Sequence, residues 1–193
     1  MKKILLLLAT GFEILEASAF IDVIGWNLEE GDRSTKLYTS GLKKEIKSSF
    51  NQTFKVDYLI EEVDVNSYDA LAIPGGFKEY NYYNDAYNEQ FLDIIRSFKA
   101  KNKIIATVCV GALPLAKSGA LKNMNGITYN NSNYIEVLKS CGVNLIHQPI
   151  VEDGNFITSS GPSTATEVAF LLLEKLTNKA NTIKVRKLMG FKN

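Results

Sequence analysis

One cysteine stands where a strand is expected to turn into a helix. Cys109 lies in the segment Thr107-Val108-Cys109-Val110-Gly111, between an apolar run and a helical pattern that starts at Val110. A nucleophile at such a turn projects over the edge of a sheet, where main-chain amides can stabilise an anion. The positive end of the helix would favour the thiolate. A buried structural cysteine explains this segment equally well, because free cysteine packs as a small hydrophobe.

Two carboxylates open an earlier helix, in Gly11-Phe12-Glu13-Ile14-Leu15-Glu16. Glu13 fits the ordinary role of an acidic residue in a first turn, which complements the helix dipole. Glu16 lies one turn further in, among apolar residues, where desolvation would raise its pKa. A protonated Glu16 can donate a hydrogen bond to a thiolate and then act as proton donor or acceptor.

A pair of glycines ends another apolar strand, in Pro74-Gly75-Gly76. Because glycine has no Cβ, its amide can come close to a ligand or to sulfur. A simple turn explains the pair equally well in isolation. The functional interpretation therefore depends on whether the three loops meet.

The elements that must position these loops alternate as in a doubly wound, mostly parallel α/β sheet. In such sheets ligands bind at the carboxyl ends of the strands, so the loops at 10–15, 75–76 and 108–111 are expected to converge. Strands are predicted at 3–9, 35–39, 69–73, 103–108, 127–129 and 156–159, with an antiparallel hairpin within 45–58 and a turn at 152–155. Helices are predicted at 13–27, 86–101, 110–117, 134–140, 164–176 and 182–189, with a serine or threonine of the segment 161–164 capping the fifth.

Composition limits the class of protein. The chain has 193 residues, 46% of them hydrophobic, and a formal net charge of +1, which fits one domain over 1–193 and gives no reason to expect nucleic acid or a membrane as partner. The first apolar run is short for a signal peptide, and no segment approaches the roughly 20 apolar residues of a membrane span. Cys109 and Cys141 lack metal-ligand spacing. We therefore expect a cytoplasmic protein with free thiols, no metal and no cofactor.

Four motifs, in this order, resemble the ThiJ/PfpI superfamily and most closely its DJ-one-like branch. They are Gly-x-Glu-x-x-Glu after the first strand, Leu-Ala-Ile-Pro-Gly-Gly, Thr-Val-Cys-Val-Gly and Thr-Ser-Ser-Gly-Pro-Ser-Thr. The resemblance implies one flavodoxin-like domain, a sheet sandwiched by helices, that usually forms a homodimer. It implies Cys109 as nucleophile, Glu16 as the carboxyl that contacts it, and an anion or oxyanion site at the amides of Gly76 and Val110. The pocket residues expected from it are Glu13, Gly75, Asn130, Gly161 and Pro162.

The chain departs from this family at its histidines. Protease-like members carry histidine directly after the cysteine, where this chain has Val110, and other members carry a later Thr-His pair, where it has Thr128-Tyr129. The only histidine, His147, falls in a different predicted strand, and we expect it at the surface or in strand packing. No Cys-His-acid triad is therefore available.

Three functions remain open from the sequence. The first is an enzyme, glyoxalase-like or deglycase-like, in which Cys109 and Glu16 act on small reactive carbonyls or glycated groups. The second is a non-enzymatic sensor or protective protein in oxidative stress, using oxidation of Cys109. The third is an inert scaffold. Peptide or amide hydrolysis is less well supported, because a poor leaving group needs both an acid and a base.

Four tyrosines follow the glycine pair: Tyr80, Tyr82, Tyr83 and Tyr87. They could form a roof over the pocket. We favour an exposed turn or a dimer surface instead.

Overall fold

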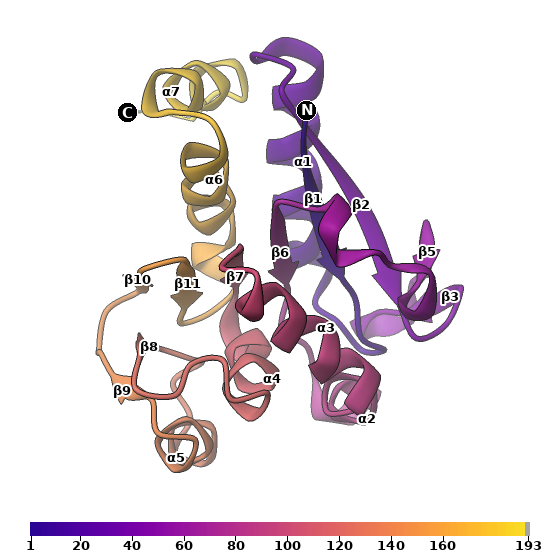
Figure 1. Cartoon of the computed structure of the whole chain (residues 1–193), viewed down its shortest axis with the longest axis vertical. Helices are drawn as coiled ribbons and strands as arrows, with labels where there is room; N and C mark the ends of the chain where they lie inside the picture. The colour runs from indigo at the N-terminus through magenta and orange to yellow at the C-terminus, as the bar shows by residue number, and fades with distance from the viewer. Residues whose placement is uncertain (192–193) are drawn as a thin grey trace.

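The computed structural model of the chain describes residues 1–191, and a seven-stranded sheet runs through them (Figure 1). The strand order is β10-β11-β7-β6-β1-β2-β5, and every neighbouring pair is parallel except β10 with β11. The strands are β1 (Lys2–Leu7), β2 (Thr35–Gly41), β5 (Tyr58–Leu59), β6 (Ala70–Ile73), β7 (Ile104–Thr107), β10 (Ile150–Asp153) and β11 (Phe156–Ser159). This confirms the predicted flavodoxin-like, mostly parallel sheet.

The centre of the sheet is its first strand. β1 pairs with β2 on one side and with β6 on the other, so that Leu5 lies between Tyr38 and Leu71. Its apolar run is buried on both faces, as is typical of a central parallel strand. The chain leaves β1 toward β2 and later returns to the opposite side at β6. The order of the strands therefore reverses between β1 and β6, and a crevice is expected at their carboxyl ends.

Helices cover both sides of the sheet (Figure 1). The first helix packs against the two last ones, although they are far apart in the sequence: α1 (Ile14–Glu30), α6 (Ala165–Leu176) and α7 (Lys179–Leu188). The remaining helices are α2 (Tyr82–Ala86), α3 (Glu89–Ala100), α4 (Ala112–Lys117) and α5 (Ser132–Ser140), of which α3 packs on β6 and β7, and α4 on α3 and α5. Among residues 1–191, no helix combines the length and the apolar character that crossing a membrane requires.

Short elements complete the loops. The predicted hairpin is confirmed as β3 (Glu45–Lys47) paired antiparallel with β4 (Thr53–Lys55), and β8 (Asn125–Gly126) pairs parallel with β9 (Asn144–Leu145). The 3₁₀ turns are η1 (Ser49–Asn51), η2 (Ile60–Glu62), η3 (Val65–Ser67), η4 (Lys78–Tyr80), η5 (Cys109–Gly111) and η6 (Pro162–Thr164).

Two sequence predictions near the site are wrong. No strand forms at 127–129, because side chains hold this segment in place of a ladder: Ile127 N donates to Thr158 Oγ1 (3.0 Å), and Thr128 Oγ1 donates to the carbonyl of Cys109 (3.0 Å). The expected cap at the start of α6 is also absent. Thr164 Oγ1 donates instead to the carbonyl of Gly161 (2.7 Å), which closes the η6 turn.

The tyrosines after the glycine pair do not form an exposed turn. Tyr82 is completely buried, and its hydroxyl donates to the carbonyl of Pro74 (2.8 Å). Tyr80, Tyr83 and Tyr87 are half-buried. The fully buried Tyr82 lies against the Pro74-Gly75-Gly76 turn. The prediction of an exposed turn is therefore wrong, and a dimer surface at the half-buried rings stays a prediction.

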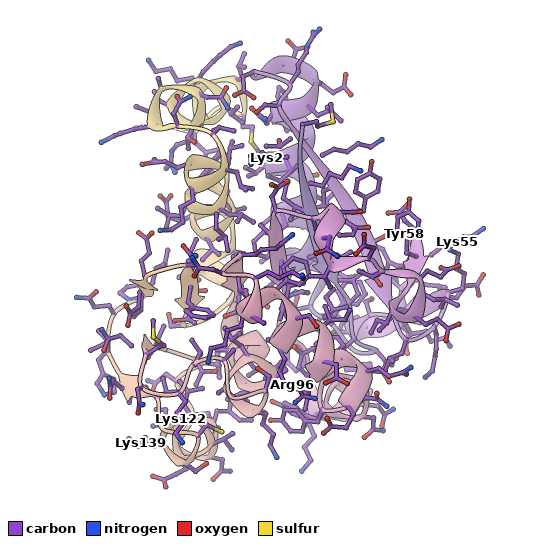
Figure 2. All side chains as sticks on the ribbon, viewed as in Figure 1. Lys2, Lys55, Tyr58, Arg96, Lys122 and Lys139 are labelled. Atoms are coloured by element: carbon purple, nitrogen blue, oxygen red, sulfur yellow. The ribbon has the colours of Figure 1, made fainter. Side chains whose placement is uncertain are left out.

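Basic side chains are distributed over separate parts of the surface. Figure 2 shows Lys2 near the start of the chain, Lys55 at the hairpin, Arg96 on α3, and Lys122 and Lys139 near α5. These five cations form no continuous patch, in keeping with the near-zero net charge of the chain.

Candidate functional site

The loops that leave β1 and β6 are joined by main-chain hydrogen bonds. Glu13 N donates to the carbonyl of Gly75 (2.8 Å), and Phe77 N donates to the carbonyl of Gly11 (3.0 Å). A Cβ at Gly76 would lie 2.3 Å from the carbonyl oxygen of Gly11, which is too close for any side chain. The second glycine is therefore required by the contact between the two loops as well as by the turn.

The cysteine sits on a strained elbow directly after β7. Cys109 has φ 56°, the left-handed region that costs a residue with a Cβ about 1–2 kcal/mol. The next turn packs so closely on β6 that a Cβ at Gly111 would lie 2.5 Å from the carbonyl oxygen of Ile73. Thr128 Oγ1 donates to the Cys109 carbonyl and holds the elbow from the other side (3.0 Å). Such strain is typical of functional residues.

A fully buried carboxyl lies beside this sulfur. Glu16, in the first turn of α1, accepts a hydrogen bond from Gly75 N at Oε2 (2.6 Å). Its other oxygen, Oε1, is buried without a hydrogen-bond partner among residues 1–191, and the thiol of Cys109 is the side chain that interacts with the carboxyl. Burial raises the pKa of Glu16 to about 8, although the contacts with Gly75 and Cys109 act in the opposite direction. Glu16 is therefore mostly protonated at neutral pH, as its apolar neighbours predicted.

The expectation of a thiolate at neutral pH is wrong. Burial raises the pKa of Cys109 well above its ordinary value, the charge of Glu16 raises it further, and the Val110 amide only partly compensates. Cys109 is 9% exposed, and α4 has only six residues, so the helix contributes little positive potential. Two acids in contact do not ionise independently. The pair holds both protons at neutral pH, and Glu16 is the first to lose one.

Cys109 lies on a cavity of about 250 Å³. Six residues predicted for the site line it: Glu13, Glu16, Gly76, Cys109, Val110 and Pro162. The amide of Gly76 has no acceptor among the described residues, and the amide of Val110 is directed to the sulfur. The sulfur of Cys109, the carboxyl of Glu16 and the backbone of Gly76 and Val110 thus border one cavity.

Three predicted pocket residues do not line this cavity. Gly75 is buried behind it and holds Glu16. Gly161 lies behind the ring of Tyr129, whose Cδ2 would be 3.5 Å from a Cβ at that glycine. Asn130 is exposed, because the segment after Thr128 turns toward solvent instead of continuing as a strand. Gly75 and Gly161 therefore contact residues of the lining, and a role for these three positions in ligand binding stays a prediction.

Five lining residues were not predicted: Phe77, Lys78, Glu79, Tyr129 and Tyr134. Phe77, Lys78 and Glu79 directly follow the glycine pair, and this position in the chain could have indicated that they lie near the site. Tyr129 stands in the Thr128-Tyr129 pair, the position at which the family resemblance led us to look for a histidine. Tyr134 comes from α5 and carries no local signal. His147 is exposed and does not line the cavity, and residues 1–191 contain no group of three or more His, Cys, Asp or Glu side chains placed to hold a metal.

Known proteins resemble the chain over most of its length. The model of the DJ-1/PfpI family matches residues 2–175. The chain is 27% identical to Protein DJ-1 homolog B of Arabidopsis thaliana over 96% of its own length, but it spans only 40% of that longer protein. It is 31% identical to Deglycase PfpI of Pyrococcus furiosus, over 69% of this chain and 76% of the relative.

One relative is similar in sequence and in structure. Protein dj-1beta of Drosophila melanogaster is 28% identical over 96% of this chain and 95% of its own length. The crystal structure of Drosophila melanogaster DJ-1beta superimposes with a TM-score of 0.86, at 26% identity, over 100% of this chain and 99% of that one.

Proposed function

The chain belongs to the DJ-1/PfpI family, and from this premise we propose that it is an enzyme that acts on small reactive carbonyl compounds or on the glycated groups that they form. The observation that carries the proposal is the buried pair of Cys109 and Glu16, facing a cavity with two amide donors. A nucleophile, a proton carrier and an oxyanion site are the groups that addition to a carbonyl needs.

Binding orients the substrate by its carbonyl oxygen. The amides of Gly76 and Val110 receive this oxygen, and the carbonyl carbon then faces the sulfur of Cys109. Because the site is largely closed to water, these two donors interact more strongly with a developing negative charge than they would in solution.

Addition requires the proton of the thiol to leave. Glu16 in its carboxylate form accepts this proton at Oε1 while the sulfur bonds to the carbonyl carbon. The electron pair of the C=O double bond moves to oxygen, which the two amides stabilise. The proton then passes from Glu16 to that oxygen, and the product is a hemithioacetal on Cys109.

With a 2-oxoaldehyde such as methylglyoxal, Glu16 also carries the next proton. Its carboxylate removes the hydrogen from the carbon that bears sulfur, which gives an enediol, and returns a proton to the neighbouring carbon. The result is a thioester of the 2-hydroxy acid. Water hydrolyses the thioester to lactate and free thiol, so that methylglyoxal and water give lactate overall. With no histidine in the cavity, the same carboxyl serves each transfer.

The test is lactate formation from methylglyoxal. Wild type is expected to produce it, and Cys109→Ser and Glu16→Gln are expected to lose at least a hundredfold of the rate, in line with general acid–base catalysis. Cys141→Ser is the matched control, because this thiol lies outside the cavity and is expected to keep the wild-type rate. Absence of lactate with wild type refutes the proposal. The redox-sensor alternative is less well supported, because a buried thiol with a raised pKa is a poor target for peroxide.

A homodimer is part of the proposal. The outer face of α1 exposes Leu15, Ile21 and Trp26, and no atom would lie within 4 Å of a Cβ at Gly25, which leaves room for a partner backbone. A second copy of the chain covers these apolar side chains, which share the face with the exposed carboxylates Asp22 and Glu29. Light scattering is expected to give twice the mass of the chain, and Trp26→Glu is expected to give the single mass.

A further inference from the structure

Three aromatic side chains extend one wall of the cavity toward solvent: Phe50, Phe77 and Tyr80, here called the aromatic triad. Phe77 lines the cavity. The ring of Phe50 lies 5.7 Å from those of both partners, and the rings of Phe77 and Tyr80 are 6.5 Å apart. Phe50 is 57% exposed and Phe77 is 41% exposed. An apolar surface thus begins beside Cys109 and continues outward.

The backbone that carries the triad is strained. Phe50 has φ 63°, a left-handed conformation that is an outlier for a bulky side chain. Asn51 and Asn81 also have positive φ (67° and 66°), but asparagine adopts this conformation readily, so the strain lies at Phe50. The exposure of Phe50 and its strained backbone both cost folding free energy, and Phe50 contributes no buried side chain to the hydrophobic core. A ligand that covers the rings would account for their exposure. Backbone strain such as that at Phe50 is common at ligand sites.

The triad is fixed to the loop that carries the catalytic carboxyl. Ser49 N donates to the carbonyl of Phe12 (2.8 Å), and Ser49 Oγ lies 2.9 Å from the carbonyl oxygen of Gly11 as donor. Phe77 N donates to the same carbonyl of Gly11 (3.0 Å). The rings therefore keep a fixed position relative to Glu16, which lies in the first turn of the helix that follows this loop.

We propose that the aromatic triad is a subsite for an aromatic or other bulky apolar group next to the reacting carbonyl of the substrate. The proposal rests on the function proposed above. The cavity of about 250 Å³ equals on the order of eight water volumes, far more than methylglyoxal needs. Gly76 and Phe77 line the same cavity, so a substituent on a carbonyl held by the Gly76 amide shares that space with the Phe77 ring.

The test compares two alkylating agents that differ by one phenyl ring, iodoacetamide and N-phenyl iodoacetamide. Second-order rates of modification at Cys109 are measured by mass spectrometry with peptide mapping, and the phenyl-to-plain ratio is taken for each variant. Phe77→Ala is expected to lower this ratio about two- to tenfold, the value of one aromatic contact. Phe77→Tyr keeps a ring and is expected to retain the ratio. Phe191→Ala is the matched control, because Phe191 is also 41% exposed but packs on Phe170, outside this cavity.

An unchanged ratio in Phe77→Ala overturns the subsite, whether or not the protein turns over any aldehyde. If Phe77→Ala does not fold, Phe77→Leu gives the same comparison with the ring removed and the volume kept. Loss of the dimer in Phe77→Ala with an unchanged ratio assigns the triad to a contact between copies and also overturns the subsite. Modification of Cys109 needs no catalytic turnover, so the ratio can be measured in an inactive protein. Absence of lactate from methylglyoxal would therefore refute the proposed function without deciding whether the subsite exists.

Discussion

Replacing Glu16 by glutamine tests the buried, neutral carboxyl directly. In the folded protein the pKa of Glu16 is raised from 4.5 to about 8. Between these two values the unfolded chain has lost the proton and the folded chain keeps it, so the free energy of unfolding falls as pH rises. The slope is about 1.4 kcal/mol per pH unit, and the loss ends once pH passes the folded pKa. Glutamine has no such proton, so Glu16→Gln lacks this contribution.

The expected result is a difference that grows with pH. Urea unfolding of wild type and Glu16→Gln at a series of pH values gives the difference in free energy of unfolding. Other titrating groups are common to both proteins and cancel. From pH 6 to pH 8.5 the variant is expected to gain about 2.5 kcal/mol relative to wild type, and to gain almost nothing above that range. Because the side chain is fully buried, solvent does not screen this effect.

A control on the same helix makes the result specific. Glu29→Gln replaces an exposed carboxyl of α1, and its difference from wild type is expected to stay level with pH. If Glu16→Gln also stays level, the carboxyl is charged in the folded protein at neutral pH. The proton transfers assigned to Glu16 would then have no basis.

Four further outcomes follow from the same geometry. The rate of lactate formation is expected to rise with pH up to about 8 and then level off, because the base is Glu16 in its carboxylate form; a flat profile from pH 6 to 8 would contradict this. Tyr129→His brings an imidazole to the cavity and is expected to speed alkylation of Cys109 at pH 7 about tenfold, whereas Tyr129→Phe is not. Gly76→Ala forces a Cβ to 2.3 Å from the Gly11 carbonyl and is expected to lower the free energy of unfolding in urea by about 1–3 kcal/mol. Thr128→Val removes the hydroxyl that donates to the buried carbonyl of Cys109 and is expected to lower the free energy of unfolding in urea by about 1–2 kcal/mol. Equal urea midpoints would show that the elbow does not depend on this hydrogen bond.

The fold was predictable because its signals are local and repeated. Continuous apolar runs marked β1, β6 and β7 as buried parallel strands, and helical spacing marked α1, α3 and α6. Their alternation fixed which loops leave the carboxyl ends. The convergence of the loops around Cys109, Glu16 and Gly76 follows from that topology.

Two features of the site could not be predicted because they depend on tertiary contacts. Thr128 leaves the strand pattern because its hydroxyl bonds to the Cys109 carbonyl, a contact between residues distant in sequence. The pKa of Cys109 depends on how completely the cavity walls exclude water, and motif spacing carries no information about that. The helix after the cysteine ends at Lys117, as predicted for 110–117, but its first turn is the 3₁₀ turn η5 and the α-helix begins only at Ala112.

The left-handed backbone at Cys109 has a consequence for relatives that have lost this chemistry. Glycine and asparagine enter that conformation more easily than cysteine does. The conformational free energy at this position therefore favours glycine or asparagine, and only the need for a sulfur atom favours cysteine. A duplicate gene released from that need is expected to drift to glycine or asparagine there while its product still folds. In comparisons of genomes, the residue at the position of Cys109 would then distinguish inactive copies from active ones.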